Sequence, residues 1–289
     1  MVKHAPDKSA FLTMQKSPQL RSLVRSFALA LTCLLVAPHP APAAGPTSAR
    51  QCAPQASLDV RESESALGSE LEILSWNIQK ASNTGWAEDL AGLADRIDLA
   101  FIQEASTQAR IDGLLPNLLH QAFAQGYTTS DLETGVMTLS SGLPSMHCKL
   151  TAMEPWLGTP KATSVTAYPL QDRPERLLAI NLHAVNFAFG LTEFRQQFDS
   201  LSDMLAEHQG PIILAGDLNT WSEDRQSLVD EFLAEFGLQP VNFEPDLRTR
   251  VFGRVLDHIY VRDLQALSAT VIPVDTSDHN PLRVRLGLL

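Results

Sequence analysis

The segment Pro211-Ile212-Ile213-Leu214-Ala215-Gly216-Asp217-Leu218-Asn219 places a carboxylate and a carboxamide directly after an apolar run. The five residues before the glycine predict a short buried strand, and the glycine predicts the turn that ends it. In open α/β sheets, ligands bind beyond the carboxyl ends of the strands. Asp217 and Asn219 are therefore predicted to lie at a functional site.

Five other apolar runs end in an acid, an amide or an imidazole. These ends are Ser75-Trp76-Asn77, Gln103-Glu104, Asn181-Leu182-His183, Leu256-Asp257-His258 and Ser277-Asp278-His279-Asn280-Pro281. Each has an ordinary structural explanation when taken alone, because Asp and Asn form turns after strands and a histidine in an apolar run is commonly a hydrogen-bonded core residue. A structural explanation of all six ends requires a coincidence of type, order and position. We therefore interpret them as parts of one catalytic crater.

From Leu71 onward, strand and helix patterns alternate along the chain. Strands are predicted over residues 71–76, 99–102, 136–139, 164–168, 177–182, 211–215, 256–261, 269–273 and 282–286, and helices over 86–97, 111–124, 192–205 and 226–236. The third helix has the clearest pattern, with Phe194, Phe198, Leu201 and Leu205 on one stripe. Strands joined by both short and helix-length connections predict two packed sheets flanked by helices in one domain.

The amino end has the layout of a secretory signal. Arg21 and Arg25 precede an uncharged apolar run over 27–37, and small residues mixed with proline follow up to Ala44. Eleven apolar residues are too few to cross a bilayer, so we predict that residues 1–44 are a cleaved signal peptide and that the protein is exported to the periplasm or beyond. A short retained anchor is the alternative, and a start at Met14 would give a more ordinary leader length.

The segment after the leader, residues 45–69, is rich in Ala, Ser, Pro, Gln and Glu without periodicity. This composition predicts a flexible lead-in before a folded domain over 70–289. Cys52 and Cys148 are the cysteines that remain after cleavage. In an oxidising compartment they can form a disulfide, and a free thiol at Cys52 is the alternative that the sequence leaves open.

Acidic residues outnumber basic ones. Removal of residues 1–44 takes away five basic residues and one acidic residue, which leaves 17 basic residues against 32 acidic residues and a net charge of −15. This charge disfavours tight, nonspecific binding of nucleic acid without a metal ion. Bound divalent cations would reverse the local sign at a site lined by carboxylates.

Taken in order, the six polar strand ends resemble those of the endonuclease/exonuclease/phosphatase superfamily, whose DNase I-like fold is an α/β four-layered sandwich of two mixed β-sheets flanked by helices. The resemblance covers residues 71–286. The superfamily includes pancreatic-type deoxyribonucleases, apurinic-site repair nucleases, inositol-polyphosphate phosphatases and bacterial sphingomyelinases. Residues 181–187 are also similar to a bacterial subgroup of this superfamily.

The resemblance implies roles for eight residues. Glu104 would hold a metal ion, which we expect to be Mg²⁺ with Mn²⁺ as the substitute, because hard ions prefer oxygen ligands. Asn77 would hold that ion or a phosphate oxygen, and Asp278 would either support a second metal position or buttress the site. Asp217 would activate a water molecule that Asn219 helps to align. His183 and His279 would donate to phosphate oxygens, and Asp257 would keep one of the two imidazoles protonated.

The resemblance implies an exported phosphoesterase, with a phosphodiester in nucleic acid as the first expected substrate and with DNA or RNA as its partner. A phospholipid or inositol-phosphate headgroup is the alternative substrate, and a binding module without turnover is the alternative function. We expect no stable membrane span after removal of the signal, and the sequence leaves the oligomeric state open.

Several other residues have two interpretations. Arg248, Arg250 and Arg254 form a basic stretch that either attracts a phosphate or balances nearby acidic residues. His258 alternates with Asp257 along a strand, so we expect it on the opposite face of the sheet in a structural role. Three further histidines, His120, His147 and His208, are expected at the surface. Aromatic rings at Phe187, Phe189 and Trp221 either line the substrate groove or pack in the core.

Overall fold

Two β-sheets form the centre of the protein. The computed structural model describes residues 51–54, 65–188 and 190–289, and every structural statement below concerns these residues. The larger sheet has the strand order β1 (Gln51–Pro54), β6 (Met146–Met153), β7 (Pro160–Leu170), β8 (Arg173–His183), β9 (Ile212–Asp217), β13 (Asp257–Arg262) and β10 (Gln239–Pro240). The smaller sheet has the order β14 (Leu264–Val271), β15 (Leu282–Leu288), β2 (Glu70–Asn77), β3 (Leu99–Ser106), β5 (Glu133–Ser140) and β4 (His120–Thr128). A separate hairpin consists of β11 (Arg250–Val251) and β12 (Arg254–Val255).

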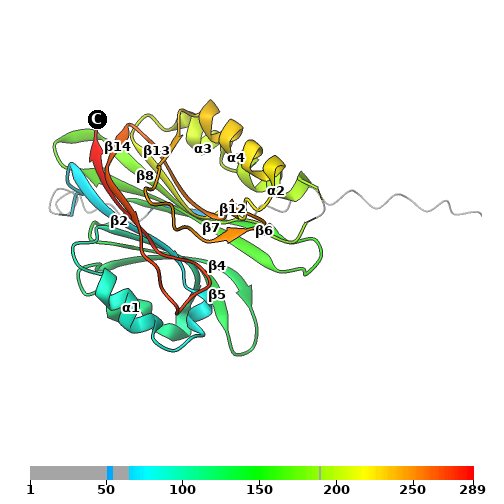
Figure 1. Ribbon diagram of the computed structural model, residues 1–289. Coiled ribbons are helices and arrows are strands. Elements are labelled where there is room, and N and C mark those ends of the chain that lie inside the picture. Colours follow the sequence, from blue (N-terminus) through cyan, green and yellow to red (C-terminus); the bar gives the residue numbers. More distant parts are fainter. Residues whose placement is uncertain (1–50, 55–64, 189) are drawn as a thin grey trace, which may run out of the picture. The chain divides into compact units, whose positions relative to one another are not determined.

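Helices cover the outer faces of both sheets (Figure 1). The helices α2 (Thr192–Asp199), α3 (Ser202–Glu207) and α4 (Glu223–Glu235) lie on the larger sheet, and α1 (Trp86–Leu93) lies on the smaller one. Three apolar clusters fill the spaces between these layers: one under α2 to α4, one between the two sheets and one under α1. The predicted four-layered sandwich of two mixed sheets is therefore confirmed.

Strand β9 shows why the fold was readable from its sequence. Every residue of β9 is buried. Ile212 and Leu214 belong to the cluster under the helices, whereas Ile213 and Ala215 belong to the cluster between the sheets. A strand that is covered on both faces needs an uninterrupted apolar run rather than an alternating one, which is the pattern of this segment.

Strand pairing brings the polar strand ends together. Strands β8 and β9 are parallel, with His183 beside Asp217. Strand β13 runs antiparallel to β9 and places Asp257 beside Asp217. In the other sheet, the parallel strands β2 and β3 place Asn77 beside Gln103. The site is thus built where the ends of internal strands of the two sheets meet.

The helix predicted over 111–124 is wrong. Residues Ile111–Leu114 form one short 3-10 turn, and His120–Thr128 is strand β4, which pairs with β5. Ala122 and Ala124 are buried while Gln121 and Gln125 are exposed, so the burial period of this segment is two rather than 3.6. Pro116 lies in the connection, where it cannot continue a helix.

Other predicted boundaries differ in smaller ways. Helix α1 ends at Leu93 instead of continuing to residue 97. The helix predicted over 192–205 is two helices, α2 and α3, but the predicted apolar stripe stays buried throughout. The prediction missed β1, β6 and β10 to β12. Strands β10 to β12 have two residues each and β1 has four, which is too short for a pattern, whereas Met146, Cys148 and Leu150 of β6 do alternate with polar residues as in a strand.

Part of the predicted flexible lead-in is ordered. Residues 51–54 form strand β1, which pairs antiparallel with β6, and a disulfide joins Cys52 to Cys148 with Cα atoms 3.9 Å apart. Leu67 is buried and bridges to Leu170. The predicted signal peptide and Phe189 lie outside the described residues.

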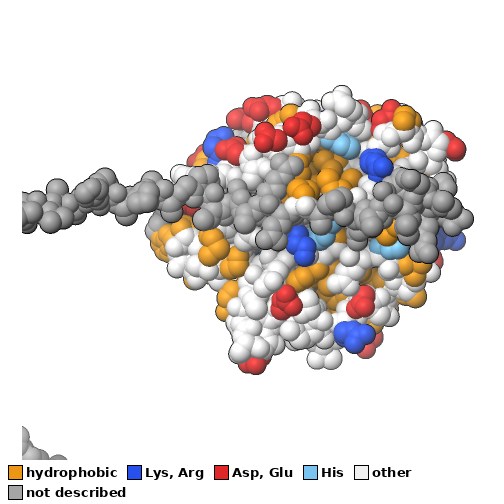
Figure 2. All heavy atoms as spheres, turned by 180° about the vertical axis from the view of Figure 1, so that it is seen from behind, with side chains coloured by type: hydrophobic (Ala, Val, Ile, Leu, Met, Phe, Trp, Pro, Cys, Tyr) orange, Lys and Arg blue, Asp and Glu red, His pale blue; other side chains and the backbone are white. Residues whose placement is uncertain are grey.

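Acidic side chains gather on one part of the face that Figure 2 shows. They lie along its upper edge, on the side of the helices α2 to α4.

In the described part of the chain, the helices all fall short of the length and apolar character that crossing a membrane requires.

Candidate active site

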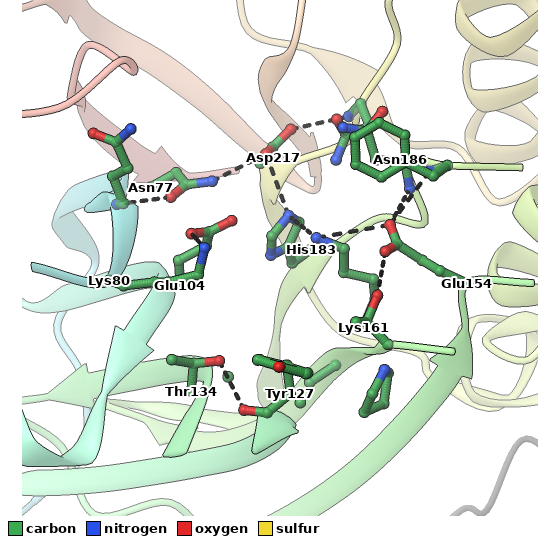
Figure 3. Close-up of a pocket in the computed structure, with 18 of the residues that line it drawn as sticks. Asn77, Lys80, Glu104, Tyr127, Thr134, Glu154, Lys161, His183, Asn186 and Asp217 are labelled. Atoms are coloured by element: carbon green, nitrogen blue, oxygen red, sulfur yellow. Dashed lines mark hydrogen bonds and ion pairs between the residues drawn. The ribbon is translucent and has the colours of Figure 1, made fainter. Parts of the chain in front are cut away.

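A cavity of about 450 Å³ opens where the polar strand ends meet. Seven of the eight predicted site residues line it: Asn77, Glu104, His183, Asp217, Asn219, Asp278 and His279. The eighth, Asp257, lies behind the cavity wall and contacts His279. Residues far apart in the sequence are therefore brought to one concave, polar site, as Figure 3 shows.

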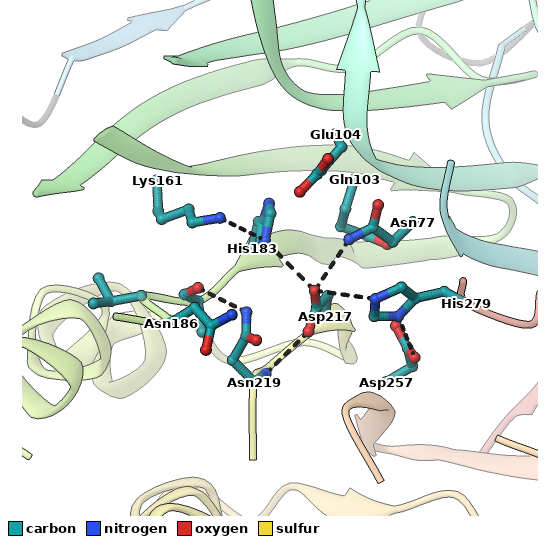
Figure 4. Close-up of polar contacts among 12 residues, drawn as sticks. Asn77, Gln103, Glu104, Lys161, His183, Asn186, Asp217, Asn219, Asp257 and His279 are labelled. Carbon is teal, nitrogen blue, oxygen red and sulfur yellow. Dashed lines mark hydrogen bonds and ion pairs between the residues drawn. The ribbon is translucent and has the colours of Figure 1, made fainter. Parts of the chain in front are cut away.

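Asp217 is the centre of the hydrogen-bond network (Figure 4). Its Oδ2 atom accepts a hydrogen bond from Asn77 Nδ2 at 3.0 Å and lies 3.5 Å from His183 Nε2 and 3.9 Å from His279 Nε2. Its Oδ1 atom accepts from the backbone N–H of Asn219 at 3.1 Å. Burial raises the pKa of Asp217 to about 6, although the positive charge of His279 opposes this rise. Asp217 therefore has a higher proton affinity than an ordinary aspartate.

His279 forms a buried pair with Asp257. The Nδ1 atom donates to Asp257 Oδ2 at 2.8 Å, and both side chains are at least 90% covered. Burial alone would lower the pKa of His279, but the carboxylates of Asp257 and Asp217 outweigh it and raise the pKa to about 10. The imidazolium ring therefore presents its Nε2–H group to the cavity as a permanent cationic donor.

The backbone around Asp217 requires a glycine and an unusual asparagine conformation. Gly216 has φ +149°, and a Cβ atom there would lie 1.9 Å from the carbonyl oxygen of Leu182. Asn219 has φ +49° and donates from Nδ2 to the carbonyl of Ala184 at 3.0 Å. Asparagine tolerates this left-handed region better than most residues. The turn after β9 is thus tied to the turn after β8.

Glu104 reaches the cavity through an irregularity in β3. The register between β3 and β5 shifts between Ile102 and Ala105, and Glu104 has φ +49°. Such bulges redirect side chains next to active sites. Glu104 Oε2 lies 3.2 Å from Lys80 Nζ, and its side chain is 20% exposed. Its carboxylate is therefore accessible from the cavity and is paired there with a lysine whose side chain is 45% exposed.

Lys161 is a cavity residue that the sequence analysis missed. It extends from β7, its side chain is 16% exposed, and its Nζ atom donates to His183 Nε2 at 3.0 Å. Burial lowers the pKa of His183 well below its ordinary value, and the charge of Lys161 lowers it further. His183 is accordingly neutral. Its Nε2 atom accepts from Lys161, so the ammonium group is the cationic donor on this side of the cavity.

Glu154 and Arg225, which the sequence analysis also missed, support the loops of the site. Glu154 is 2% exposed, lies 3.8 Å from Lys161 Nζ through its Oε1 atom, and accepts from the backbone N–H of Asn186 at 2.8 Å. Arg225 is 1% exposed and donates to the carbonyls of Val185 and Asn219 at 2.7 and 3.1 Å. Neither lies at the polar end of an apolar run, so the pattern that identified the other residues could not find them.

The basic stretch before Asp257 fits its structural interpretation. Arg248 and Arg250 both bond to Asp246, at 2.9 and 2.7 Å, and Arg254 bonds to Glu223 at 3.1 Å. Each guanidinium group therefore has an acidic partner within the protein.

The histidines outside the cavity have structural surroundings. His258 is buried, its Nε2 atom contacts Thr220 Oγ1 at 2.7 Å, and burial lowers its pKa to about 3. The three histidines expected at the surface, His120, His147 and His208, are partly buried. His147 contacts Ser164 Oγ at 3.0 Å.

The cavity offers oxygen atoms to a divalent ion. Glu104 and the exposed Asp278 supply carboxylates, and Asn77 supplies a carboxamide whose oxygen accepts from the backbone N–H of Gln79 at 3.0 Å. A second set of potential ligand atoms, from Asp217, Asp257 and His279, lies within 4.8 Å of one another. In that set the imidazole is already hydrogen-bonded to a carboxylate. The oxygen-rich first set fits a hard ion such as Mg²⁺ or Mn²⁺ better.

The fold and the site together define a class of protein. Residues 74–279 match the Endonuclease/Exonuclease/phosphatase family, and the chain belongs to this family. Its members typically hydrolyse phosphoesters and generally use divalent metal ions.

Three known proteins illustrate the relationship. The chain is 41% identical over 229 residues to a UPF0294 protein of Vibrio cholerae, covering 77% of this chain and 80% of that protein. A structure of D. rerio TDP2 with a single-strand DNA product shares the fold, with a TM-score of 0.53 at 18% identity, covering 76% of this chain and 99% of that chain. A mannosyl-6-phosphatase of Bacteroides thetaiotaomicron has a TM-score of 0.54 at 19% identity, covering 75% of this chain and 99% of that chain.

Proposed function

We propose that the protein is an exported, Mg²⁺-dependent phosphodiesterase that uses activated water as its nucleophile. The observation that carries this proposal is the buried carboxylate of Asp217, held by Asn77 and Asn219 and faced by the cationic His279 in one cavity. Family membership supports phosphoester hydrolysis in general. The structural relatives named above act on, or were solved with, phosphate-bearing molecules, which also supports it.

Asp217 has the properties of a general base. A base is most effective when its pKa lies near the working pH, and the pKa of Asp217 is raised to about 6. The amide of Asn77 and the backbone of Asn219 fix the orientation of the carboxylate from two sides. Asp217 can therefore remove a proton from a water molecule that attacks phosphorus.

Two cationic donors frame the position that a phosphate group would occupy. His279 is held protonated by Asp257, and Lys161 is oriented by His183 and Glu154. Fixed donors that face the developing negative charge stabilise the transition state, because they need little reorganisation during the reaction. His279 and Lys161 would thus bind non-bridging phosphate oxygens. A divalent ion held by Glu104, Asp278 and Asn77 would add positive charge at the phosphate.

The test uses bis(p-nitrophenyl) phosphate as a simple diester. We expect hydrolysis with Mg²⁺ and its loss with a chelator. Asp217→Asn should lower kcat by about 10²–10⁴-fold, the usual contribution of a positioned base. Asp95→Asn is the matched control, because this side chain is 80% exposed, and it should retain activity. Full activity of Asp217→Asn would contradict the assigned base.

Export is proposed separately. The leader pattern over residues 1–44 supports it, and so does the disulfide between Cys52 and Cys148, since disulfides persist in oxidising compartments. Cell fractionation followed by mass spectrometry tests this proposal. We expect periplasmic or secreted protein that lacks residues 1–44, whereas a reduced, full-length cytoplasmic protein would contradict it.

A further inference from the structure

An apolar pocket of about 380 Å³ adjoins the catalytic cavity. Six large side chains line it: Trp156, Phe187, Trp221, Val251, Phe252 and Leu256. The pocket and the cavity share Asn219, Phe187 and Leu256 among their lining residues. A molecule bound at the catalytic residues can therefore extend directly into the apolar pocket.

Exposed apolar side chains are concentrated at this mouth. Eleven large apolar side chains of the described residues are exposed, and six of them line the pocket or the adjoining cavity. These six are Tyr127 (39% exposed), Trp156 (57%), Leu157 (58%), Phe187 (54%), Val251 (37%) and Phe252 (86%). Single exposed apolar residues are common, but a contiguous group of them indicates an interaction site or a ligand-binding groove.

Hydrogen bonds hold the pocket walls in place. The indole N–H of Trp221 donates to Asn186 Oδ1 at 3.0 Å, and the guanidinium of Arg225 lies 4.5 Å from the Trp221 ring centre. Glu154 Oε1 accepts from the backbone N–H of Phe187 at 3.3 Å. The polar atoms of this wall are therefore engaged within the protein, and the rings are left to contact a ligand. A preformed wall reduces the entropy cost of binding.

Phe252 occupies a position that disfavours it. The two residues at the tip of the β11–β12 hairpin, Phe252 and Gly253, have φ +51° and φ +79°. Turns of this kind strongly prefer Asn, Asp or Gly at the first position, and a bulky residue there is strained. The Phe252 ring meets Trp221 edge to face, with ring centres 6.4 Å apart. Strained residues of this kind concentrate at functional sites.

We propose that this pocket is a subsite for a large aliphatic group on one ester of the substrate, so that the substrate is a phospholipid-like phosphodiester. This proposal rests on the proposed function. An aliphatic group needs no hydrogen bonds, and two polar atoms that could pair with the edge of a nucleobase, Asn186 Oδ1 and Asn219 Nδ2, already bond to Trp221 and Ala184. The net charge of −15 that remains after removal of residues 1–44 also disfavours a polyanionic strand more than a single phosphate.

A homologous series of substrates tests the subsite. The methyl, butyl and octyl esters of p-nitrophenyl phosphate share one leaving group and differ only in aliphatic length. If the alkyl group enters the pocket, kcat/KM should rise with length, by up to about fourfold for each fully buried methylene. A thymidine ester of p-nitrophenyl phosphate serves as the nucleoside comparison, and the octyl ester should be hydrolysed faster than it.

Substitutions in the pocket test whether the dependence of kcat/KM on alkyl length arises there. Phe252→Ser and Trp156→Ser should each reduce the increase in kcat/KM between the methyl and octyl esters by at least about tenfold, because each removes one aromatic wall. Leu119→Ser is the matched control, since Leu119 is 77% exposed and lies outside the pocket. It should keep the full dependence on chain length.

The outcomes separate this proposal from the proposed function. Turnover of the methyl ester with no increase along the series would overturn the subsite and leave the phosphodiesterase intact. Faster hydrolysis of the thymidine ester than of the octyl ester would assign the pocket to a nucleobase instead. Absence of turnover with every ester and Mg²⁺ would refute the proposed function and this proposal with it.

Discussion

Replacement of Arg225 is the strongest available test of how the site is held together. Its guanidinium donates to the carbonyls of Val185, Asn219 and Asn186 at 2.7, 3.1 and 2.9 Å. These carbonyls belong to the turns that follow β8 and β9, so one side chain joins the loops that carry the polar residues. We expect Arg225→Met to loosen both loops and to destabilise the fold.

The structure sets the size of the effect. Each lost bond from a charged donor costs about 1.5–3 kcal/mol, and a buried carbonyl without a donor costs about 1–3 kcal/mol. Asn186 O keeps a second donor, the backbone N–H of Ala188 at 3.2 Å, so two carbonyls lose their partner. The expected loss is therefore about 3–5 kcal/mol of unfolding free energy, a large fraction of the total stability of an ordinary domain.

Urea unfolding at pH 7 measures this loss, with circular dichroism as the probe. Arg225→Lys should recover only part of it, because an ammonium group lacks the planar fork that reaches several carbonyls and stacks on Trp221. Arg254→Met is the control, since its partner Glu223 is 79% exposed and an exposed pair contributes less than about 1 kcal/mol. Equal unfolding free energies for the Arg225→Met and Arg254→Met proteins would refute the reasoning.

Three further changes have defined outcomes. Lys161→Met should lower kcat on bis(p-nitrophenyl) phosphate by about 10²-fold through the loss of a cationic donor, and an unchanged kcat would remove Lys161 from the site. Cys148→Ser should cost about 2–5 kcal/mol in urea unfolding, because the Cys52–Cys148 disulfide spans 96 residues; equal stability with and without reductant would contradict this. Burial lowers the pKa of His147 to about 4 in the native protein. As the pH falls, His147 therefore takes up a proton in the unfolded chain before it does so in the native protein, and the free energy of unfolding should decrease by about 2–3 kcal/mol between pH 6.5 and pH 4. His147→Gln should lack this loss, and an identical pH dependence would show that His147 does not contribute.

The sequence predicted the layers of the fold because buried strands and helix faces have recognisable patterns of apolar residues. The run over 211–215 is apolar throughout, and β9 is covered on both faces. The stripe of Phe194, Phe198, Leu201 and Leu205 likewise remained buried although the helix breaks between α2 and α3. By contrast, residues 111–124 carry apolar side chains that fit either period. Pairing of β4 with β5 decides in favour of a strand, and that pairing is a long-range contact that local periodicity cannot contain.

The polar strand ends were predictable for a related reason. Asn77, His183 and Asp217 each end a buried strand, so their position in the sequence fixes their position in the sheet. Lys161 lies near the beginning of β7, and Glu154 follows the end of β6. Both reach the cavity because of the length and twist of the hairpin formed by β6 and β7. The local sequence does not determine that geometry.

The distribution of charge explains how an acidic protein can bind a phosphate. The cavity is lined by four carboxylates, Glu104, Glu154, Asp217 and Asp278, and by three cationic groups, Lys80, Lys161 and His279. A divalent ion held by the carboxylates would therefore supply the positive charge that a phosphate needs. At physiological ionic strength, charges in water are screened over about 8 Å. A single phosphate in the cavity therefore interacts mainly with that ion and with the cations beside it, whereas phosphates farther along a polymer lie beyond their range and meet a chain whose net charge is −11. This difference favours a substrate with one phosphate, in agreement with the apolar pocket that adjoins the site.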